Sequence, residues 1–174
     1  ETGFLTPTPY GDAADCILSD APDWLLRRYN LVVVTGELEG GQEIRDRLEE
    51  YVRQGGHLVI TAGNLRKFPQ GVGGIRAAGP VKEYPAGTRV LVNKQEYMET
   101  QPFQLTELEI PEVSQVLAFH DETPVAVRVK CGEGNITAFA SLYGVPSKLA
   151  CEAPVKSALD KPLPKPYPLL EHVR

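Results

Sequence analysis

The residues with the most chemical potential follow two short apolar runs in the first half of the chain. Glu37 comes shortly after the first run, and Thr61 and Asn64 come at the end of the second. If both runs are parallel strands, these side chains meet at the carboxyl edge of a sheet, where open α/β sheets bind ligands. A carboxylate, a hydroxyl and an amide there predict a polar crevice that a hydrolase or transferase could use. Alternatively, the acids of segment 37–39 are solvated and cap the following helix.

Metal and cofactor sites find little support in the sequence. The three cysteines, Cys16, Cys131 and Cys151, show no C-x-x-C spacing, and the three histidines are dispersed along the chain. The glycine-rich stretch 71–74 follows no strand directly and lacks the Lys-Ser/Thr end of a phosphate-binding loop. We therefore predict neither a metal nor a cofactor.

The elements that must position the candidate residues form one strand–helix–strand unit. Residues 31–36 are short, β-branched and apolar, which is typical of a buried strand, and residues 57–61 repeat that pattern after Gly55-Gly56. Between them, residues 42–54 predict an amphipathic helix. Its apolar stripe is Ile44, Leu48, Tyr51 and Val52, and its water-facing side is Arg45, Asp46, Arg47, Glu49, Glu50 and Arg53. A crossover this short makes the two strands parallel neighbours.

The rest of the chain predicts mostly antiparallel structure. A short helix capped by Ser19 or Asp20 precedes the central unit, and residues 14–19 indicate a short strand. Glycines and prolines over residues 69–80 argue against a regular element there. Strands are expected over 88–92, 103–110, 114–119, 124–129 and 135–141, the last three as a meander. The predicted fold class is α/β: a flavodoxin-like parallel sheet flanked by helices, with an antiparallel β extension in the C-terminal half.

Length and charge limit the classes of partner. At 174 residues the chain predicts one domain over residues 4–150, followed by a Pro-rich tail, strap or linker over 151–174. A net charge of -5 with scattered basic residues argues against a nucleic-acid partner. No apolar run approaches the roughly 20 residues that span a bilayer, so we predict no membrane insertion by this chain.

The central unit carries a family resemblance. The run Tyr29–Val34, the helix that ends in Tyr51–Gly56, and the run His57–Thr61 resemble the class I glutamine amidotransferase-like fold. More narrowly, they are similar to the noncatalytic, trimer-forming domain of family 42 β-galactosidases and its relatives in large glycoside hydrolases. The segments Val116–Phe119, Thr123–Val127 and Cys131–Ile136 are similar to the hairpin that ends those domains.

The resemblance implies where a catalytic apparatus would lie. An active amidotransferase places a nucleophilic cysteine on a strained strand-to-helix turn. Here that turn is residues 59–63, and Thr61 stands in place of the cysteine. The family's His-x-Glu partner has one candidate in His120 and Glu122, although we interpret residues 120–123 as a solvated turn. The leading hypothesis is therefore a noncatalytic assembly domain that contacts another protein domain or subunit.

Two further hypotheses concern sugars and location. Tyr84 and Tyr97, beside the irregular stretch, could contact a partner or a sugar, which leaves a carbohydrate-binding module as an alternative. Asn135 begins an Asn-Ile-Thr glycosylation sequon in an expected turn, and the opening Glu-Thr-Gly resembles the remnant of a secretion vector. Both favour a secreted or cell-surface glycoprotein. In such a protein Cys131 and Cys151 could form a disulfide worth roughly 3 kcal/mol, but three reduced cysteines are an equal alternative.

Overall fold

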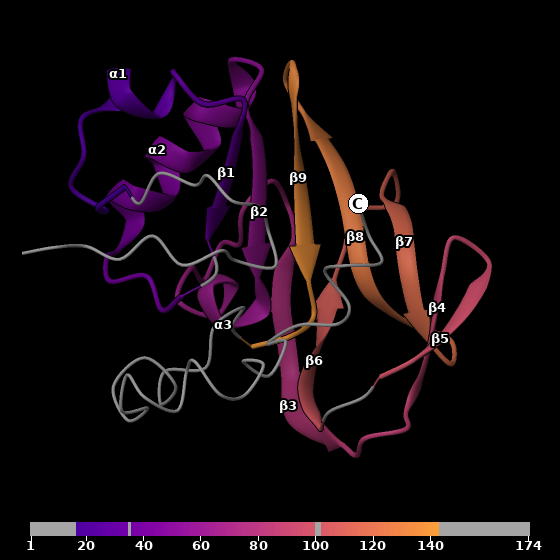
Figure 1. The fold of residues 1–174 in the computed structure, drawn as a ribbon. Coiled ribbons are helices and arrows are strands. Elements are labelled where there is room, and N and C mark those ends of the chain that lie inside the picture. Colours follow the sequence, from indigo (N-terminus) through magenta and orange to yellow (C-terminus); the bar gives the residue numbers. More distant parts are fainter. Residues whose placement is uncertain (1–16, 35, 100–101, 143–174) are drawn as a thin grey trace, which may run out of the picture.

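The computed structural model describes residues 17–34, 36–99 and 102–142, and the structural statements below concern these residues. Their order is α1, β1, α2, β2, α3 and then β3 to β9. Figure 1 shows how these elements are arranged: the helices lie beside the first strands, and the later strands extend the sheet away from them. The predicted domain ends, residues 4–16 and 143–150, and the tail 151–174 lie outside the described residues.

The predicted strand–helix–strand unit is confirmed. β1 (Leu31–Val34) pairs in parallel with β2 (His57–Thr61), from Leu31 opposite His57 to Val34 opposite Ile60. α2 (Gln42–Arg53) connects them and ends where the predicted glycine pair begins. Gly55 has φ of 105°, a conformation in which a residue without a Cβ is favoured.

The predicted meander is also confirmed, and its last strand joins the parallel unit. β7 (Gln115–His120), β8 (Thr123–Cys131) and β9 (Gly134–Phe139) pair antiparallel in sequence order. β9 then pairs in parallel with β2. Because β9 lies between β2 and β8, one strand joins the parallel and antiparallel halves of a single sheet.

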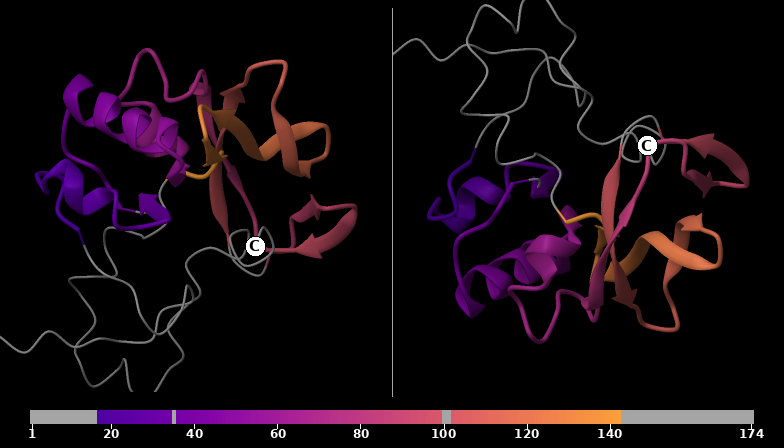
Figure 2. Two further views of the ribbon diagram at one scale, coloured as in Figure 1. Left: turned by 90° about the horizontal axis from the view of Figure 1, so that it is seen from above. Right: turned by 90° about the horizontal axis from the view of Figure 1, so that it is seen from below.

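A hairpin completes the seven-stranded sheet. β4 (Arg89–Val92) pairs antiparallel with β5 (Gln95–Met98) and with β7, which produces the strand order β1-β2-β9-β8-β7-β4-β5. The run at residues 88–92 was predicted, but β5 was not, because its residues Gln95 and Glu96 are polar and exposed. Figure 2 shows this hairpin projecting at the end of the sheet opposite α2.

A two-stranded ribbon contradicts one expectation. β3 (Arg76–Tyr84) pairs antiparallel with β6 (Phe103–Glu109), although its sequence contains Gly79 and Pro80. The register shifts between Ala78 and Lys82, so the glycine and proline lie in a bulge, and Gly79 has φ of 72°. The prediction of an irregular segment over 69–80 was wrong from residue 76 onward, because a bulge accommodates both residues without ending a strand.

Helices are fewer than the predicted fold class requires. The predicted short helix is α1 (Asp23–Leu26), which has a single turn. Neither Ser19 nor Asp20 caps it, because Pro22 occupies the N-cap position. α3 (Ala62–Leu65) is equally short. The α/β class is confirmed, but the described sheet is mixed, with only β1, β2 and β9 parallel. Of the expected strand at 14–19, residues 14–16 lie outside the described part, and Ile17 and Leu18 are not in a strand.

Two buried clusters hold the layers together. The larger one packs the apolar stripe of α2 on β2, β8 and β9, with Val52, Ile60 and Ile136 fully buried. The smaller one packs β4, β7 and β8 against β6 and the end of β9. In the described part of the chain no helix is long and apolar enough to cross a membrane.

Candidate functional site

The predicted strand-to-helix turn exists, and Thr61 lies at its corner. β2 ends at Thr61, and α3 begins with the next residue. Thr61 has an ordinary extended backbone, with φ of -103° and ψ of 157°, and it is only 1% exposed. A catalytic nucleophile of this fold would instead be exposed and would have a strained backbone. The hydroxyl is therefore in the predicted place but is buried and unstrained.

Asn64 ties this turn to the loop after β1. Its side-chain amide donates to the carbonyl oxygen of Gly36 at 2.8 Å, and its side-chain oxygen accepts from the backbone N–H of Leu38 at 2.9 Å. The same amide lies 3.3 Å from the Thr61 hydroxyl oxygen, to which it donates. Asn64 is fully buried, and its amide satisfies one backbone carbonyl and one backbone N–H of the loop after β1. We call Gly36, Leu38, Thr61 and Asn64 the Asn64 cluster.

The backbone N–H groups at the start of α3 are also used within the protein. Such groups can stabilise a developing oxyanion when they face a substrate. Here Ala62 donates to the carbonyl oxygen of Ser141 at 2.9 Å, and Gly63 donates to that of Leu142 at 2.7 Å. These bonds anchor the chain after β9 against the turn, and they leave neither N–H group directed at solvent.

Glu37 lies near this cluster but points outward. Its carboxylate pairs with the Lys67 ammonium at 2.9 Å, and its side chain is 60% exposed. Lys67 also donates to the carbonyl oxygen of Leu38 at 2.8 Å. The structure therefore brings Thr61 and Asn64 into contact and leaves Glu37 in an exposed ion pair above the same loop. Of the alternative, solvation is confirmed, because Glu37 and Glu39 are exposed, but capping is wrong, because the N-cap of α2 is Gly41 and the helix start has no side-chain cap hydrogen bond.

The His-x-Glu candidate lies elsewhere in the sheet. His120 ends β7, three strands from β2 in the strand order, and strands lie about 4.8 Å apart, which separates it from Thr61 by about 14 Å along the sheet. Its ring nitrogen Nδ1 lies 2.9 Å from the carbonyl oxygen of Arg89, and its ring meets the Tyr84 ring edge-on at 4.7 Å. His120 is thus half-buried in β7, and the two-residue turn is Asp121-Glu122.

The tyrosines predicted to contact a sugar are part of the protein's own packing. Tyr84 stacks on Phe103 with ring centroids 5.4 Å apart and is half-buried. Tyr97 packs against the smaller core cluster, and its hydroxyl donates to the side-chain oxygen of Gln95 at 2.8 Å. Neither ring lies open as a flat platform of the kind that binds sugars.

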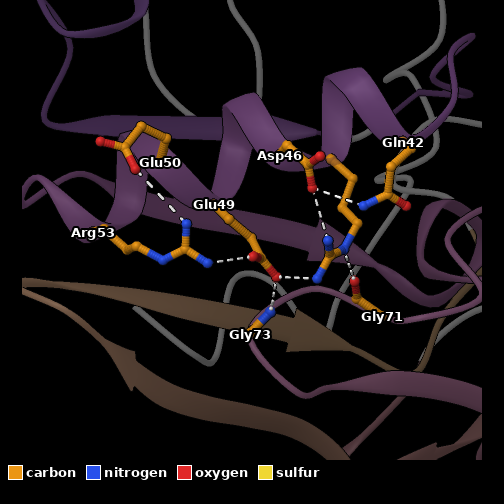
Figure 3. Close-up of polar contacts among 8 residues, drawn as sticks. Gln42, Asp46, Glu49, Glu50, Arg53, Gly71 and Gly73 are labelled. Atoms are coloured by element: carbon orange, nitrogen blue, oxygen red, sulfur yellow. Dashed lines mark hydrogen bonds and ion pairs between the residues drawn. The ribbon is translucent and has the colours of Figure 1, made fainter.

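Sequence reasoning missed one buried carboxylate that has three hydrogen-bond partners. Glu49 was assigned to the water-facing side of α2, but it is 5% exposed. Its carboxylate accepts from Arg45 at 2.8 Å, from Arg53 at 2.7 Å and from the backbone N–H of Gly73 at 2.9 Å (Figure 3). Arg45 in turn donates to the carbonyl oxygen of Gly71 at 2.6 Å. We call these five residues the Glu49 cluster.

The Glu49 cluster fastens the glycine-rich stretch onto α2. That stretch and the residue after it carry Val72 and Ile75 into the larger core, and both are fully buried. A signal for the cluster was present in the sequence, since arginines lie four residues before and four residues after Glu49 on the helix. What the sequence could not supply was the loop that covers this side of α2.

Cys131 is a free thiol at the end of β8. Burial raises its pKa above the ordinary thiol value; the Arg53 guanidinium opposes this rise and the Glu49 carboxylate adds to it. The structure therefore gives no support to a disulfide with Cys151, which lies outside the described residues.

The sequon residue Asn135 lies in a strand, not in the expected turn. The turn is Gly132-Glu133, and Asn135 is the second residue of β9, paired with β2 and β8. It is half-buried, and its side-chain nitrogen lies 3.2 Å from Nδ1 of the exposed His57. Within residues 17–142, apart from the gaps named above, no group of three His, Cys, Asp or Glu side chains could hold a metal ion.

The fold matches solved structures at low sequence identity. A cold-adapted β-galactosidase from Rahnella sp. R3 aligns with a TM-score of 0.55 and 20% identity, over 74% of this chain and 22% of that one. The cytoplasmic protein STM1381 from Salmonella typhimurium LT2 aligns with a TM-score of 0.53 and 20% identity, over 76% and 71% of the two chains. A ThuA-like protein from Bacteroides uniformis aligns with a TM-score of 0.52 and 13% identity, over 72% and 65%. This chain has the class I glutamine amidotransferase-like fold.

The predicted resemblance to a domain of family 42 β-galactosidases is confirmed at the level of the fold. The chain spans about a fifth of the length of those enzymes, 19% and 22% in two of them. No protein-family model and no curated protein matches the sequence.

Proposed function

We propose that this chain is a noncatalytic amidotransferase-like domain of a larger secreted or cell-surface protein, of the glycoside-hydrolase type. It works by presenting a surface to another domain or subunit. The supporting observation is that the groups at the strand-to-helix turn are already paired with one another or with the backbone. The Thr61 hydroxyl accepts from Asn64, and the N–H groups of Ala62 and Gly63 donate to Ser141 and Leu142.

The arrangement around Thr61 lacks what a nucleophile requires. A threonine needs a base within hydrogen-bonding reach, about 3 Å, to lose its proton. His120 is three strands away, and the Asn64 amide that touches Thr61 is a donor and cannot serve as a base. The resemblance to family 42 enzymes implies the same role, because the similar domain there is noncatalytic.

The β4–β5 hairpin is the surface that we assign to the partner. Leu91 and Met98 lie diagonally across it on the face opposite the core, with 41% and 60% exposure. Beside them, Arg89 and Glu96 form an exposed ion pair at 3.1 Å. Exposed apolar side chains next to an ion pair offer both the apolar and the polar contacts that protein–protein interfaces use. The hairpin also projects from the sheet, which leaves it accessible (Figure 2).

Light scattering coupled to size-exclusion chromatography tests the proposal on the chain alone and with the neighbouring domains of its parent protein. We expect association that the double substitution Leu91→Glu with Met98→Glu abolishes. Val113→Glu is the matched control, because Val113 is 84% exposed and belongs to the segment before β7 rather than to the hairpin. Association that survives the double substitution would contradict the assignment of the hairpin.

Catalysis is tested separately on the same chain. We expect no release of ammonia from glutamine and no ester hydrolysis above the buffer rate. Turnover that disappears in Thr61→Val would show that the turn is an active site and would overturn the noncatalytic proposal.

A further inference from the structure

The parallel strands are covered unequally on their two faces. On one face α2 lies over the strands (Figure 2). There Leu58 and Ile136 belong to the larger core cluster with the apolar stripe of α2 and are buried. On the other face Leu31 and Val33 of β1 are 52% and 41% exposed, and neither belongs to a core cluster. Parallel strands usually have both faces covered. Within the described residues, the part of this face that β1 forms is therefore exposed to solvent.

The sequon lies on the same open face. Leu31 is opposite His57, and His57 is opposite Asn135, so the three side chains form one row across β1, β2 and β9. The contact of 3.2 Å between Asn135 Nδ2 and His57 Nδ1 confirms that these two share a face. Two strand spacings separate Asn135 from β1, which is about 10 Å. A large group attached to Asn135 can therefore reach Leu31 and Val33.

We propose that Asn135 carries an N-linked glycan that lies across this face and covers Leu31 and Val33. The inference rests on the secretory location in the proposed function. A lipid-pyrophosphate-linked oligosaccharide supplies the sugar: the Asn135 amide nitrogen bonds to the anomeric carbon and gives up one proton, and the bond from that carbon to the pyrophosphate oxygen breaks. The nonpolar faces of the sugar rings then shield apolar side chains from water, and the hydroxyl groups face the solvent.

The glycan also restricts where a partner binds. A glycosylated β1–β2–β9 face cannot pack against another domain, whereas the β4–β5 hairpin lies at the other end of the sheet order and stays free. The modification would thereby direct assembly to the hairpin.

The first test is the occupancy of the sequon in the full chain secreted from mammalian cells. We expect a glycosidase-sensitive mass difference of one glycan that is lost in Asn135→Gln and kept in Thr137→Ser, which preserves the sequon. An unmodified Asn135 in the secreted protein would overturn the proposal. Because occupancy and oligomeric state are separate measurements, failure here leaves the assembly test intact.

The second test asks what the glycan covers. Enzymatic removal of the glycan from the folded protein should raise the fluorescence of a dye that binds apolar surface several-fold. The increase should vanish in the Leu31→Thr with Val33→Thr background. An equal increase in both backgrounds, or none in either, would show that the glycan does not lie over β1. Because the glycan is removed after folding, the result does not depend on whether Asn135→Gln folds.

Discussion

The Glu49 cluster and the Asn64 cluster both fasten a loop to the domain, but they use different chemistry. Glu49 holds the glycine-rich stretch 71–73 with a buried charge shared between two arginines. Asn64 holds the loop 36–38 with a neutral amide that replaces two backbone partners. Only the second lies where an α/β enzyme carries its chemistry. Position at a strand end therefore does not by itself indicate function; the hydrogen-bond partners decide.

The largest effect is expected from removing the charge at Glu49. Glu49→Ala leaves Arg45, which is 14% exposed, and the Gly73 N–H without their shared acceptor, and we expect a loss of about 3 kcal/mol in the free energy of unfolding. Urea titration measures it. Glu50→Ala is the control on the same helix, because Glu50 is half exposed and should cost less than about 0.5 kcal/mol. Equal losses of stability in the two variants would show that the Glu49 cluster does not stabilise the domain.

Asn64→Ala tests the neutral cluster. It removes the partners of the Gly36 carbonyl and the Leu38 N–H, and we expect a loss of about 2 to 3 kcal/mol in the free energy of unfolding. Thr61→Val, which removes only one weak contact of 3.3 Å, should cost about 1 kcal/mol. If Thr61→Val proved the more damaging of the two, the hydroxyl would have a role that the described contacts do not explain.

The backbones of the two loops should also differ in their tolerance of a side chain. Gly71 has φ of 70°, and an added Cβ would lie 2.1 Å from the carbonyl oxygen of Ile75, so Gly71→Ala should cost about 2 kcal/mol. An added Cβ at Gly36 meets nothing within 4 Å, so Gly36→Ala should be close to neutral. Thermal unfolding of the two variants, compared with the unsubstituted chain, measures the contrast. If Gly71→Ala unfolded at the same temperature as the unsubstituted chain, the glycine-rich stretch would have to shift to make room for the added Cβ.

The smallest effect concerns Cys131, beside the Glu49 cluster. Its pKa is raised in the folded state, so the stability linked to the neutral thiol is present below the ordinary thiol pKa and is lost as pH rises through the folded value. We expect slower alkylation at mildly alkaline pH than in urea, measured with Cys16 and Cys151 replaced by serine. Cys131→Ser should remove this contribution to the pH dependence of unfolding. Alkylation as fast in the folded chain as in urea would contradict the burial argument.

Local pattern was enough to predict the regular elements with strong periodicity. The stripe Leu48, Tyr51 and Val52 predicted α2, and alternation predicted β6. β3 and β5 were missed for opposite reasons. Gly79 and Pro80 appeared to interrupt β3 but occupy a bulge, and β5 is polar because it is an exposed edge strand whose partner β4 supplies the pairing.

The candidate site divides in the same way. The sequence by itself placed Thr61 and Asn64 at the carboxyl end of the second parallel strand, because apolar runs and a short crossover determine which residues reach that edge. Only the tertiary structure decided that Asn64 binds the loop 36–38, that Glu49 is buried, and that Asn135 shares a face with Leu31. These contacts join residues 24 or more positions apart, and periodicity within one element carries no information about which distant segment covers it.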